Sequence, residues 1–143
     1  MLEKTLVLIK PDAVERNLIG KILNIYEDNG LKIKEMKMLQ ASTSLAEMHY
    51  REHRGRDYYE NLIAYITRSP LVALVLEGQE AIARVRKING STKPEKAEEG
   101  TIRKLYALGP TLNSVHASDS PESAIREISL WFGDELLMAA SDS

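Results

Sequence analysis

The sequence predicts an α+β sandwich in which helices pack on one face of a mixed, mainly antiparallel sheet of four strands. Apolar runs of strand length alternate with segments whose apolar residues recur at helical spacing, and turn residues separate the two. The order is strand, helix, strand, helical hairpin, strand, helix, long loop, strand and helix. No repeat or linker interrupts it, so we expect one domain over residues 1–143.

The first half of the predicted fold is the more regular. A buried strand at residues 4–10 ends at Pro11, which cannot donate to a ladder. The helix after it ends at Asn29-Gly30, where a left-handed turn is tolerated. A second strand starts at Leu31, and its apolar residues change phase along its length. We therefore expect a β-bulge near Lys34-Glu35.

A helical hairpin is predicted between the second and third strands. Ser44 and Glu47 read as a capping box that opens a helix to about Glu52. A second helix opens near Asp57, and Ser69-Pro70 ends the hairpin.

The second half contains the long loop. Residues 71–76 form a continuous apolar run, predicted to be a strand buried on both faces. A helix follows at 79–89 and ends at Asn89-Gly90. Residues 91–112 lack a regular pattern, and loops of this length are usually functional. The last strand contains Val115 and His116. The loop contains these punctuating or reactive residues: Thr92, Lys93, Pro94, Gly100, Arg103, Gly109 and Pro110.

Composition limits the classes of function. The chain has 19 cationic and 21 anionic residues, a net charge of −2, so its overall balance does not recruit nucleic acid. It has no cysteine, which excludes disulfides, thiolate zinc sites and thiol catalysis. No apolar run approaches the length of a membrane span or a signal peptide. We expect a cytoplasmic protein that binds neither membranes nor a specific nucleic acid.

One histidine stands out as a nucleophile. His116 lies just ahead of a well-marked helix start, where Ser120 is an N-cap and Pro121 occupies the first helical position. Glu127, in that helix, is placed to reach back and stabilise the cationic ring, and Ser118 lies beside it. An imidazole is largely neutral at pH 7, so one nitrogen keeps a lone pair for attack.

The other two histidines carry a less specific signal. His49 and His53 are separated by one helical turn, a spacing that can bind a metal. Their neighbours Arg51, Glu52 and Arg54 are charged, and no third ligand is evident. We interpret the pair as a solvated polar face and predict no metal site.

Several cations and a threonine are placed to bind phosphate. They lie at the ends of predicted elements or in the long loop: Lys10, Arg56, Arg86, Thr92 and Arg103. Guanidinium groups bind phosphate oxygens bidentately, so together these residues fit a polyphosphate clamp. No Walker-type glycine loop is present. Tyr50 and Tyr58 read equally well as core or as base-stacking residues.

Three motifs carry a resemblance to a known family. Lys10-Pro11-Asp12, Gly100-Thr101-Ile102-Arg103 and Asn113-x-x-His116-x-Ser118-Asp119-Ser120 occur in the order and spacing of the nucleoside diphosphate kinases. From about residue 4 to residue 136 the chain resembles this family, and its end soon after Phe132 resembles the short bacterial type. The resemblance implies a ferredoxin-like fold. It also implies transfer of the γ-phosphate of a nucleoside triphosphate, typically ATP, to a nucleoside diphosphate by a ping-pong mechanism.

The resemblance assigns a role to each matching residue. His116 matches the histidine that is phosphorylated, while Glu127 and Ser118 match the groups that orient it. Tyr50 matches a tyrosine near the transferred phosphoryl group. The matches to the nucleotide ligands are Lys10, Arg86, Thr92 and Arg103 for phosphate, Asn113 for ribose and Tyr58 for base stacking. Mg²⁺ is implied as a bridge between nucleotide phosphates, and a homo-oligomer, tetramer or hexamer, as the assembly.

The sequence departs from the commonest family pattern at several positions, none of which replaces a proposed catalytic group. They are Lys93, Lys104-Leu105-Tyr106, Leu112, Ala117 after the histidine, and Tyr58 where phenylalanine is frequent. These departures bear on loop packing, subunit contacts and nucleotide preference.

Two other classes of protein share this order of elements. One is a ferredoxin-like RNA-binding module, which needs exposed aromatic residues on its central strands, and the apolar runs at 5–9 and 71–76 contain none. The other is a non-catalytic regulatory module that binds a nucleotide or another small molecule. In that module His116 is a hydrogen-bonding core residue.

Overall fold

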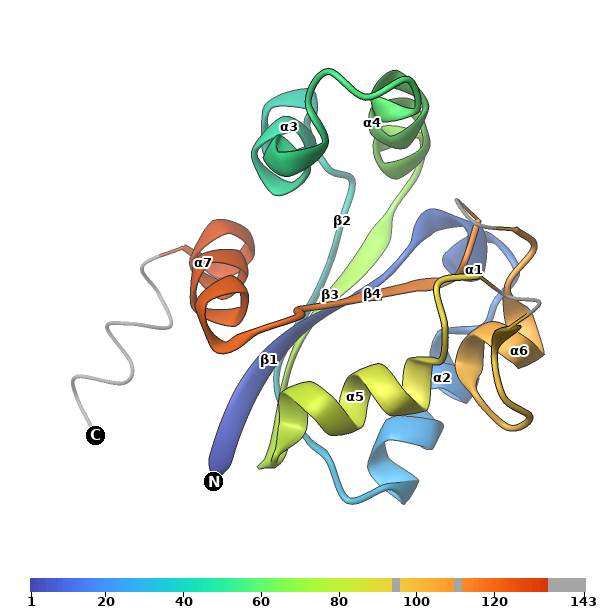
Figure 1. The fold of residues 1–143 in the computed structure, drawn as a ribbon, viewed down its shortest axis with the longest axis vertical. Coiled ribbons are helices and arrows are strands. Elements are labelled where there is room, and N and C mark those ends of the chain that lie inside the picture. Colours follow the sequence, from blue (N-terminus) through green and yellow to red (C-terminus); the bar gives the residue numbers. More distant parts are fainter. Residues whose placement is uncertain (94–95, 110–111, 134–143) are drawn as a thin grey trace.

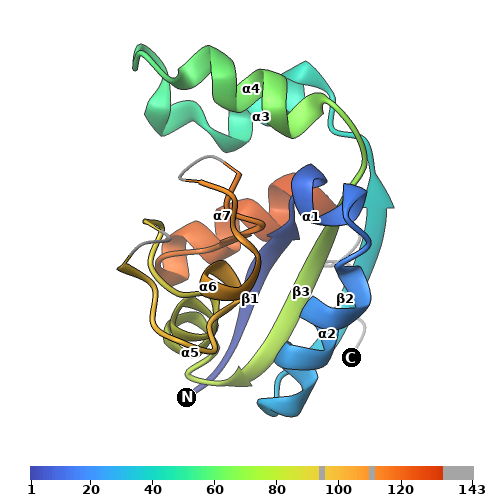
Figure 2. The ribbon, with the colours of Figure 1, turned by 90° about the vertical axis from the view of Figure 1, so that its right-hand side faces the viewer.

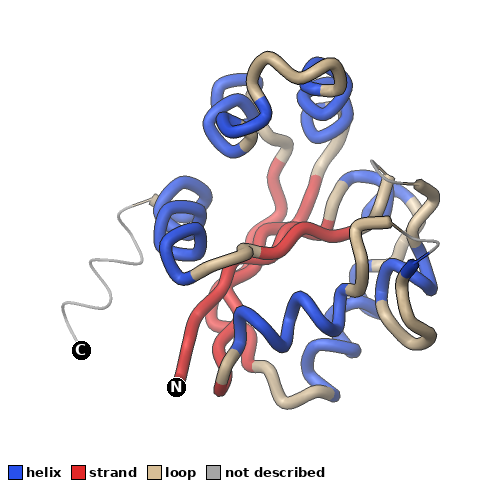
Figure 3. The backbone as a smooth tube through the Cα atoms, in the orientation of Figure 1, coloured by secondary structure: helices blue, strands red, loops and turns tan. Residues whose placement is uncertain are grey.

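The computed structural model describes residues 1–93, 96–109 and 112–133. Pro94 and Pro110 of the predicted loop lie outside these ranges. The sheet has four strands. It forms the centre of the fold, and helices surround it (Figures 1 and 3). The elements are β1 (Leu2–Ile9), α1 (Pro11–Glu15), α2 (Ile19–Asp28), β2 (Lys32–Leu39), α3 (Thr43–His49), a 3-10 turn η1 (Arg51–His53), α4 (Tyr59–Thr67), β3 (Leu71–Gln79), α5 (Ala81–Asn89), α6 (Ile102–Tyr106), β4 (Val115–Ala117) and α7 (Pro121–Phe132).

The strands lie in the order β2-β3-β1-β4, and every pairing is antiparallel. The prediction of four strands is confirmed, whereas the predicted mixture with parallel pairing is wrong. The register of β2 against β3 shifts between Ile33 and Glu35, which confirms the predicted bulge. The bulge reconciles the two phases of apolar residues with a single strand.

Helices cover both faces of the sheet, so the predicted single covered face is wrong (Figure 2). On one face Val7 and Leu74 pack with α2 and α5, and on the other Leu8 and Val75 pack with α3, α4 and α7. The physical reason is the uninterrupted apolar character of β1 and β3. Because side chains alternate between faces, a continuous apolar strand makes both faces apolar, and each needs a cover.

Two short helices differ from the prediction. Helix α1 begins at Pro11, because proline ends a strand and also suits the first helical position. Helix α6 lies within the predicted loop, and Thr101 caps it by accepting a hydrogen bond from the Lys104 backbone N–H at 3.3 Å. The predicted long loop is therefore interrupted by a short helix that contains Arg103.

The first helix of the hairpin begins earlier than predicted. Ser42 is its N-cap, and the Ser42 Oγ accepts from the Leu45 N–H at 3.1 Å. The Ser44–Glu47 capping box is therefore wrong. Only Ser44 has a glutamate three residues later, but Ser44 lies inside the helix, whereas Ser42 has the extended backbone of an N-cap.

Gly90 ends α5 as predicted, in a left-handed conformation with φ of 89°. A Cβ at this position would lie 2.6 Å from Thr101 Oγ1, so the α5 end and the α6 cap are in close contact. The Gly90 carbonyl also accepts from Arg103 Nη1 at 2.6 Å.

We expect Gly90→Ala to destabilise the protein by about 2–3 kcal/mol, because left-handed strain adds to a steric clash. This lowers the melting temperature by about 4–12 °C for a chain of this size, measured by circular dichroism. Gly100→Ala is the matched control, since Gly100 has φ of 86° but a Cβ there would meet no atom within 4 Å beyond its chain neighbours. Equal losses in the two variants would show that the contact with Thr101 is unimportant.

No helix in the described part of the chain is both long and apolar enough to cross a membrane.

Candidate active site

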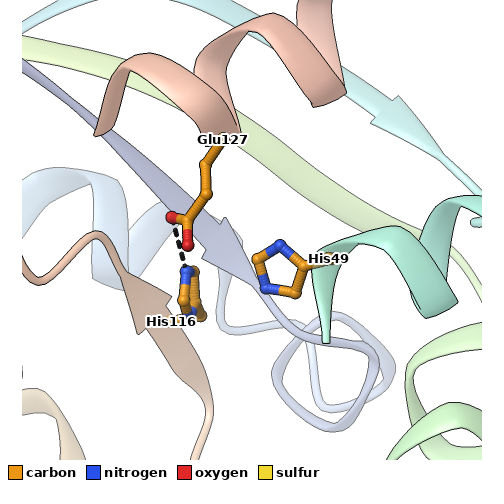
Figure 4. Close-up of side chains that lie close together, drawn as sticks. All are labelled: His49, His116 and Glu127. Carbon is orange, nitrogen blue, oxygen red and sulfur yellow. Dashed lines mark hydrogen bonds and ion pairs between the residues drawn. The ribbon is translucent and has the colours of Figure 1, made fainter. Parts of the chain in front are cut away.

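His116 and Glu127 meet where the edge strand β4 leads into α7. His116 pairs with Leu8 of β1, which fixes its backbone in the sheet. Helix α7 starts as predicted, with Ser120 as N-cap and Pro121 in the first turn. The side chains join through His116 Nε2 and Glu127 Oε1 at 2.9 Å (Figure 4). The two residues that the sequence singled out are therefore in direct contact.

Ser118 holds the Glu127 carboxylate from the other side. Its hydroxyl donates to Glu127 Oε1 at 2.8 Å and accepts from the Leu6 backbone N–H at 3.3 Å. Burial acts to raise the pKa of Glu127, but the hydrogen bonds from His116 and Ser118 and the charge of Arg126 outweigh it and lower the pKa. An ionised carboxylate only accepts hydrogen bonds. It therefore favours the tautomer of His116 with hydrogen on Nε2, which leaves the lone pair on Nδ1.

His49 belongs to the site, so its assignment to a solvated face is wrong. The residue is 5% exposed, and its Nδ1 accepts from Trp131 Nε1 at 3.0 Å. Its ring lies 4.5 Å from that of His116 at an interplanar angle of 78°. Burial, together with the charge of His116, lowers the pKa of His49 well below its ordinary value, so His49 is neutral at pH 7. The spacing of His49 and His53 indicated that both lie on one face of a helix. It could not show that His49 packs against Trp131 of α7.

His49, His116 and Glu127 also form a compact trio, with one ligand-type atom from each within 4.8 Å of the others (Figure 4). Such a trio is able to hold a metal ion, and it supplies the third ligand that the sequence did not reveal. The absence of a structural metal remains a prediction, and elemental analysis of protein purified without added metal tests it.

A cavity of about 140 Å³ opens beside His116. Its lining combines the predicted nucleophile with predicted phosphate ligands from three other parts of the chain. The lining includes Tyr50, Arg86, Thr92, Arg103, His116 and Glu127. A larger cavity of about 540 Å³ shares Arg86, Thr92 and Arg103 with it. Two guanidinium groups beside the proposed nucleophile make this an anion-binding environment.

Arg103 is a fixed cation at the floor of this environment. It is 8% exposed, and its guanidinium donates to the Gly90 carbonyl at 2.6 Å and the Val115 carbonyl at 2.8 Å. Burial and the charge of Arg86 lower its pKa to about 10, against an opposing effect of Tyr26. Arg103 therefore stays charged at neutral pH.

Lys10 and Asn113 form a pair next to the cavity but are not part of its lining. Lys10 Nζ donates to Asn113 Oδ1 at 2.9 Å, and the Lys10 backbone N–H donates to the Ser114 carbonyl at 2.8 Å. Ser114 has a left-handed φ of 74°, an uncommon conformation for this residue type. Burial and the charge of Arg103 lower the pKa of Lys10 to about 8, against an opposing effect of Asp12.

The pKa of Lys10 predicts an alkaline limit. Above about pH 8 the folded protein loses this charge, so kcat/KM for nucleotides should fall. Lys10→Gln should have a lower kcat/KM without that alkaline fall. Because the unfolded chain keeps the Lys10 proton to about pH 10.5, the same group makes the free energy of unfolding rise with pH between 8 and 10.5. Identical pH profiles for the two proteins would contradict a role for Lys10.

Tyr50 and Tyr58, which the sequence could not assign to the core or to base stacking, have different surroundings. Tyr50 is buried in the cluster that joins α3, α4 and α7 and is among the residues that line the cavity, and its hydroxyl is buried without a hydrogen-bond partner. Burial and the nearby charge of Glu127 raise the pKa of Tyr50, so it keeps its proton. Tyr58 is 44% exposed and lies outside the cavity lining. Arg56 is exposed and is likewise not part of that lining.

Comparisons with known proteins agree on one family. The family pattern described as nucleoside diphosphate kinase matches residues 3–137. A nucleoside diphosphate kinase from Clostridium perfringens is 66% identical over 131 residues, which are 92% of this chain and 92% of that protein. One from Haemophilus ducreyi is 51% identical over 135 residues, 94% of this chain and 98% of that protein.

Solved structures give the same result. The nucleoside diphosphate kinase of Aquifex aeolicus superposes with a TM-score of 0.88 at 41% identity, covering 91% of this chain and 94% of that one. The enzyme from Encephalitozoon cuniculi gives 0.91 at 34% identity, covering 93% and 90%. The ferredoxin-like fold is thereby confirmed. With the match over nearly its whole length, the chain belongs to the nucleoside diphosphate kinase family.

Proposed function

We propose that this protein transfers the γ-phosphate of a nucleoside triphosphate, typically ATP, to a nucleoside diphosphate, through a phosphohistidine at His116. One observation carries the proposal: His116 is held by Glu127 at 2.9 Å beside a cavity that Arg86 and Arg103 also line. A covalent intermediate lets donor and acceptor use the same phosphate site in turn. The site therefore needs no room for both nucleotides at once.

The first half-reaction forms one bond and breaks another. The lone pair of His116 Nδ1 attacks the γ-phosphorus, a P–N bond forms, and the bond to the β,γ-bridging oxygen breaks. The nucleoside diphosphate leaves with that electron pair. The ring becomes cationic, and the Glu127 carboxylate stabilises it through Nε2. In the second half-reaction a terminal oxygen of another nucleoside diphosphate attacks the phosphorus and a P–O bond forms. The P–N bond breaks, and its electron pair returns to Nδ1 of His116.

The surrounding side chains bind and stabilise charge. Arg86 and Arg103 offset negative charge on the transferring oxygens, while Thr92 adds a hydroxyl donor. Lys10, which is outside the cavity lining, is assigned to the phosphates by its family motif. Tyr50 lines the same cavity, and its hydroxyl, which has no partner within the protein, is proposed to donate to a phosphoryl oxygen. Asn113 is assigned to the ribose and Tyr58 to the base, where stacking tolerates every nucleobase.

The residues present fit a Mg²⁺ ion carried by the nucleotide. Such an ion uses few protein carboxylates, because the substrate phosphates supply most of its ligands. Asp119 lines the cavity, and a hydrogen bond from Ser123 lowers its pKa, so it is an ionised oxygen ligand able to hold the ion. When bound, Mg²⁺ neutralises phosphate charge.

The proposed assembly is a homo-oligomer, tetramer or hexamer. Its support is the edge strand β2, where Met36 and Met38 are 53% and 57% exposed. Unpaired backbone and exposed apolar side chains on one edge favour association with another copy. The molar mass from light scattering distinguishes the two states. The absence of cysteine supports a cytoplasmic location.

The test is incubation with Mg²⁺ and γ-labelled ATP. We expect acid-labile, base-stable label on the protein, removed by added GDP. Folded protein without label would favour the alternative, a non-catalytic module that binds nucleotide or RNA. The RNA-binding form of that alternative needs an open sheet face, whereas helices cover both faces here.

A further inference from the structure

Tyr58 makes a hydrogen bond that phenylalanine, frequent at this position in the family, cannot make. Its hydroxyl lies 2.7 Å from His53 Nδ1, and the two ring centroids are 5.5 Å apart at an interplanar angle of 62°. Tyr58 itself stands at the start of α4 and is 44% exposed. The hydrogen bond to His53 constrains the orientation of this exposed ring.

His53 connects Tyr58 to the interior of the site. The His53 ring lies 5.8 Å from that of Tyr50, and His53 lines the cavity beside His116 although Tyr58 does not. Tyr50 in turn lies 4.8 Å from His49. Edge-to-face contacts therefore connect His49, Tyr50 and His53, and His53 joins this group to the exposed Tyr58.

We propose that His53 is a positioning residue for nucleotide binding: it fixes the Tyr58 ring in the orientation on which the base of a nucleoside di- or triphosphate stacks. This rests on the proposed function, which assigns the base to Tyr58. A ring that is already fixed loses less conformational freedom when the base binds, so the bond increases nucleotide affinity. Donor and acceptor nucleotides use the same base site, so the affinity for both is affected. The rate of phosphoryl transfer at His116 is not expected to change.

A double-mutant cycle tests the proposal. The proteins are wild type, Tyr58→Phe, His53→Ala and the double variant, and the readouts are the Kd for Mg·ADP by calorimetry and the KM and kcat for transfer from ATP to GDP. Loss of one hydrogen bond should raise Kd and KM by about two- to tenfold in each single variant. Tyr58→Phe should add nothing in the His53→Ala background. The kcat should change by less than about twofold.

Two further variants separate positioning from a structural role. Tyr59→Phe is the matched control, because it deletes the neighbouring tyrosine's hydroxyl, which is buried without a partner, and it should leave Kd unchanged. His53→Asn keeps a polar group near the place of Nδ1 and should restore affinity. A purely structural His53 would lower the melting temperature without this pattern in Kd. If His53→Ala does not fold, His53→Leu completes the cycle.

The outcomes are distinct. Equal effects of Tyr58→Phe in the presence and absence of His53 would overturn the proposal, because the contact would then carry no binding energy. Normal label transfer through His116 with no coupling would refute only the role of His53. Absence of label transfer in every protein would refute the proposed function, while the Kd cycle would still decide whether His53 positions Tyr58.

Discussion

His116→Ala is expected to abolish phosphoryl transfer, with a loss of kcat of at least about 10⁴-fold. Among the described residues, His49 is the other histidine in contact with the His116 ring, and it cannot replace the nucleophile. Its Nδ1 accepts a hydrogen bond from Trp131, and Nε2 of the neutral ring carries the proton, so neither nitrogen has a free lone pair. The variant cannot form the phosphoenzyme, so γ-label should be absent as well. The measurement is the rate of GTP formation from ATP and GDP, paired with the label assay.

The His116→Ala variant should keep its fold. The His116 side chain is 22% exposed, and β4 pairs with β1 through the backbone. Glu127 retains its bond from Ser118 and its ion pair with Arg126 at 3.6 Å, so no buried charge is left alone. Circular dichroism checks the fold. Substantial transfer by a pure preparation of folded variant would rule out His116 as the nucleophile.

Glu127→Gln should slow kcat by about 10–100-fold without preventing phosphorylation of His116. The amide keeps the shape of the side chain but removes the charge that stabilises the cationic ring. It can also present a donor to Nε2, so it no longer fixes the proton of His116 there. The rate of label incorporation after rapid mixing with ATP measures this step directly.

The control for Glu127→Gln lies on the same helix. Glu122 is exposed in the first turn of α7, so Glu122→Gln removes the same charge away from the cavity and should leave kcat unchanged. Equal rates for Glu127→Gln and wild type would mean that the contact between Glu127 and His116 does not contribute to catalysis.

Short-range patterns predicted those features that depend on neighbours in the chain. The phase change in β2 predicted its bulge, and Ser120-Pro121 predicted the start of α7, because both signals arise within a few residues. The Ser42 cap shows the limit of this reasoning. The capping-box pattern pointed to Ser44, which precedes Glu47 by three residues, whereas the observed N-cap is Ser42, which has no such partner.

The spacing of the motifs predicted most of the residues that the structure brings together at the candidate site. The resemblance assigned His116, Glu127 and Ser118, and the structure joins these three by hydrogen bonds. It also places Arg86, Thr92 and Arg103 around one cavity with them. The assignment of Lys10 and Asn113 to the same nucleotide is consistent with their mutual bond, although the pair lies outside the cavity lining.

By itself, the sequence predicted the four strands and the longer helices in their order, and it singled out the proposed nucleophile and the cations proposed to accompany it. The tertiary structure decided that His49 is buried against His116, that both sheet faces are covered, and that His53 holds Tyr58. The reason is the range of the interactions. Periodicity and capping are set by residues a few positions apart. Whether a helix face is buried or exposed depends on which distant element packs against it.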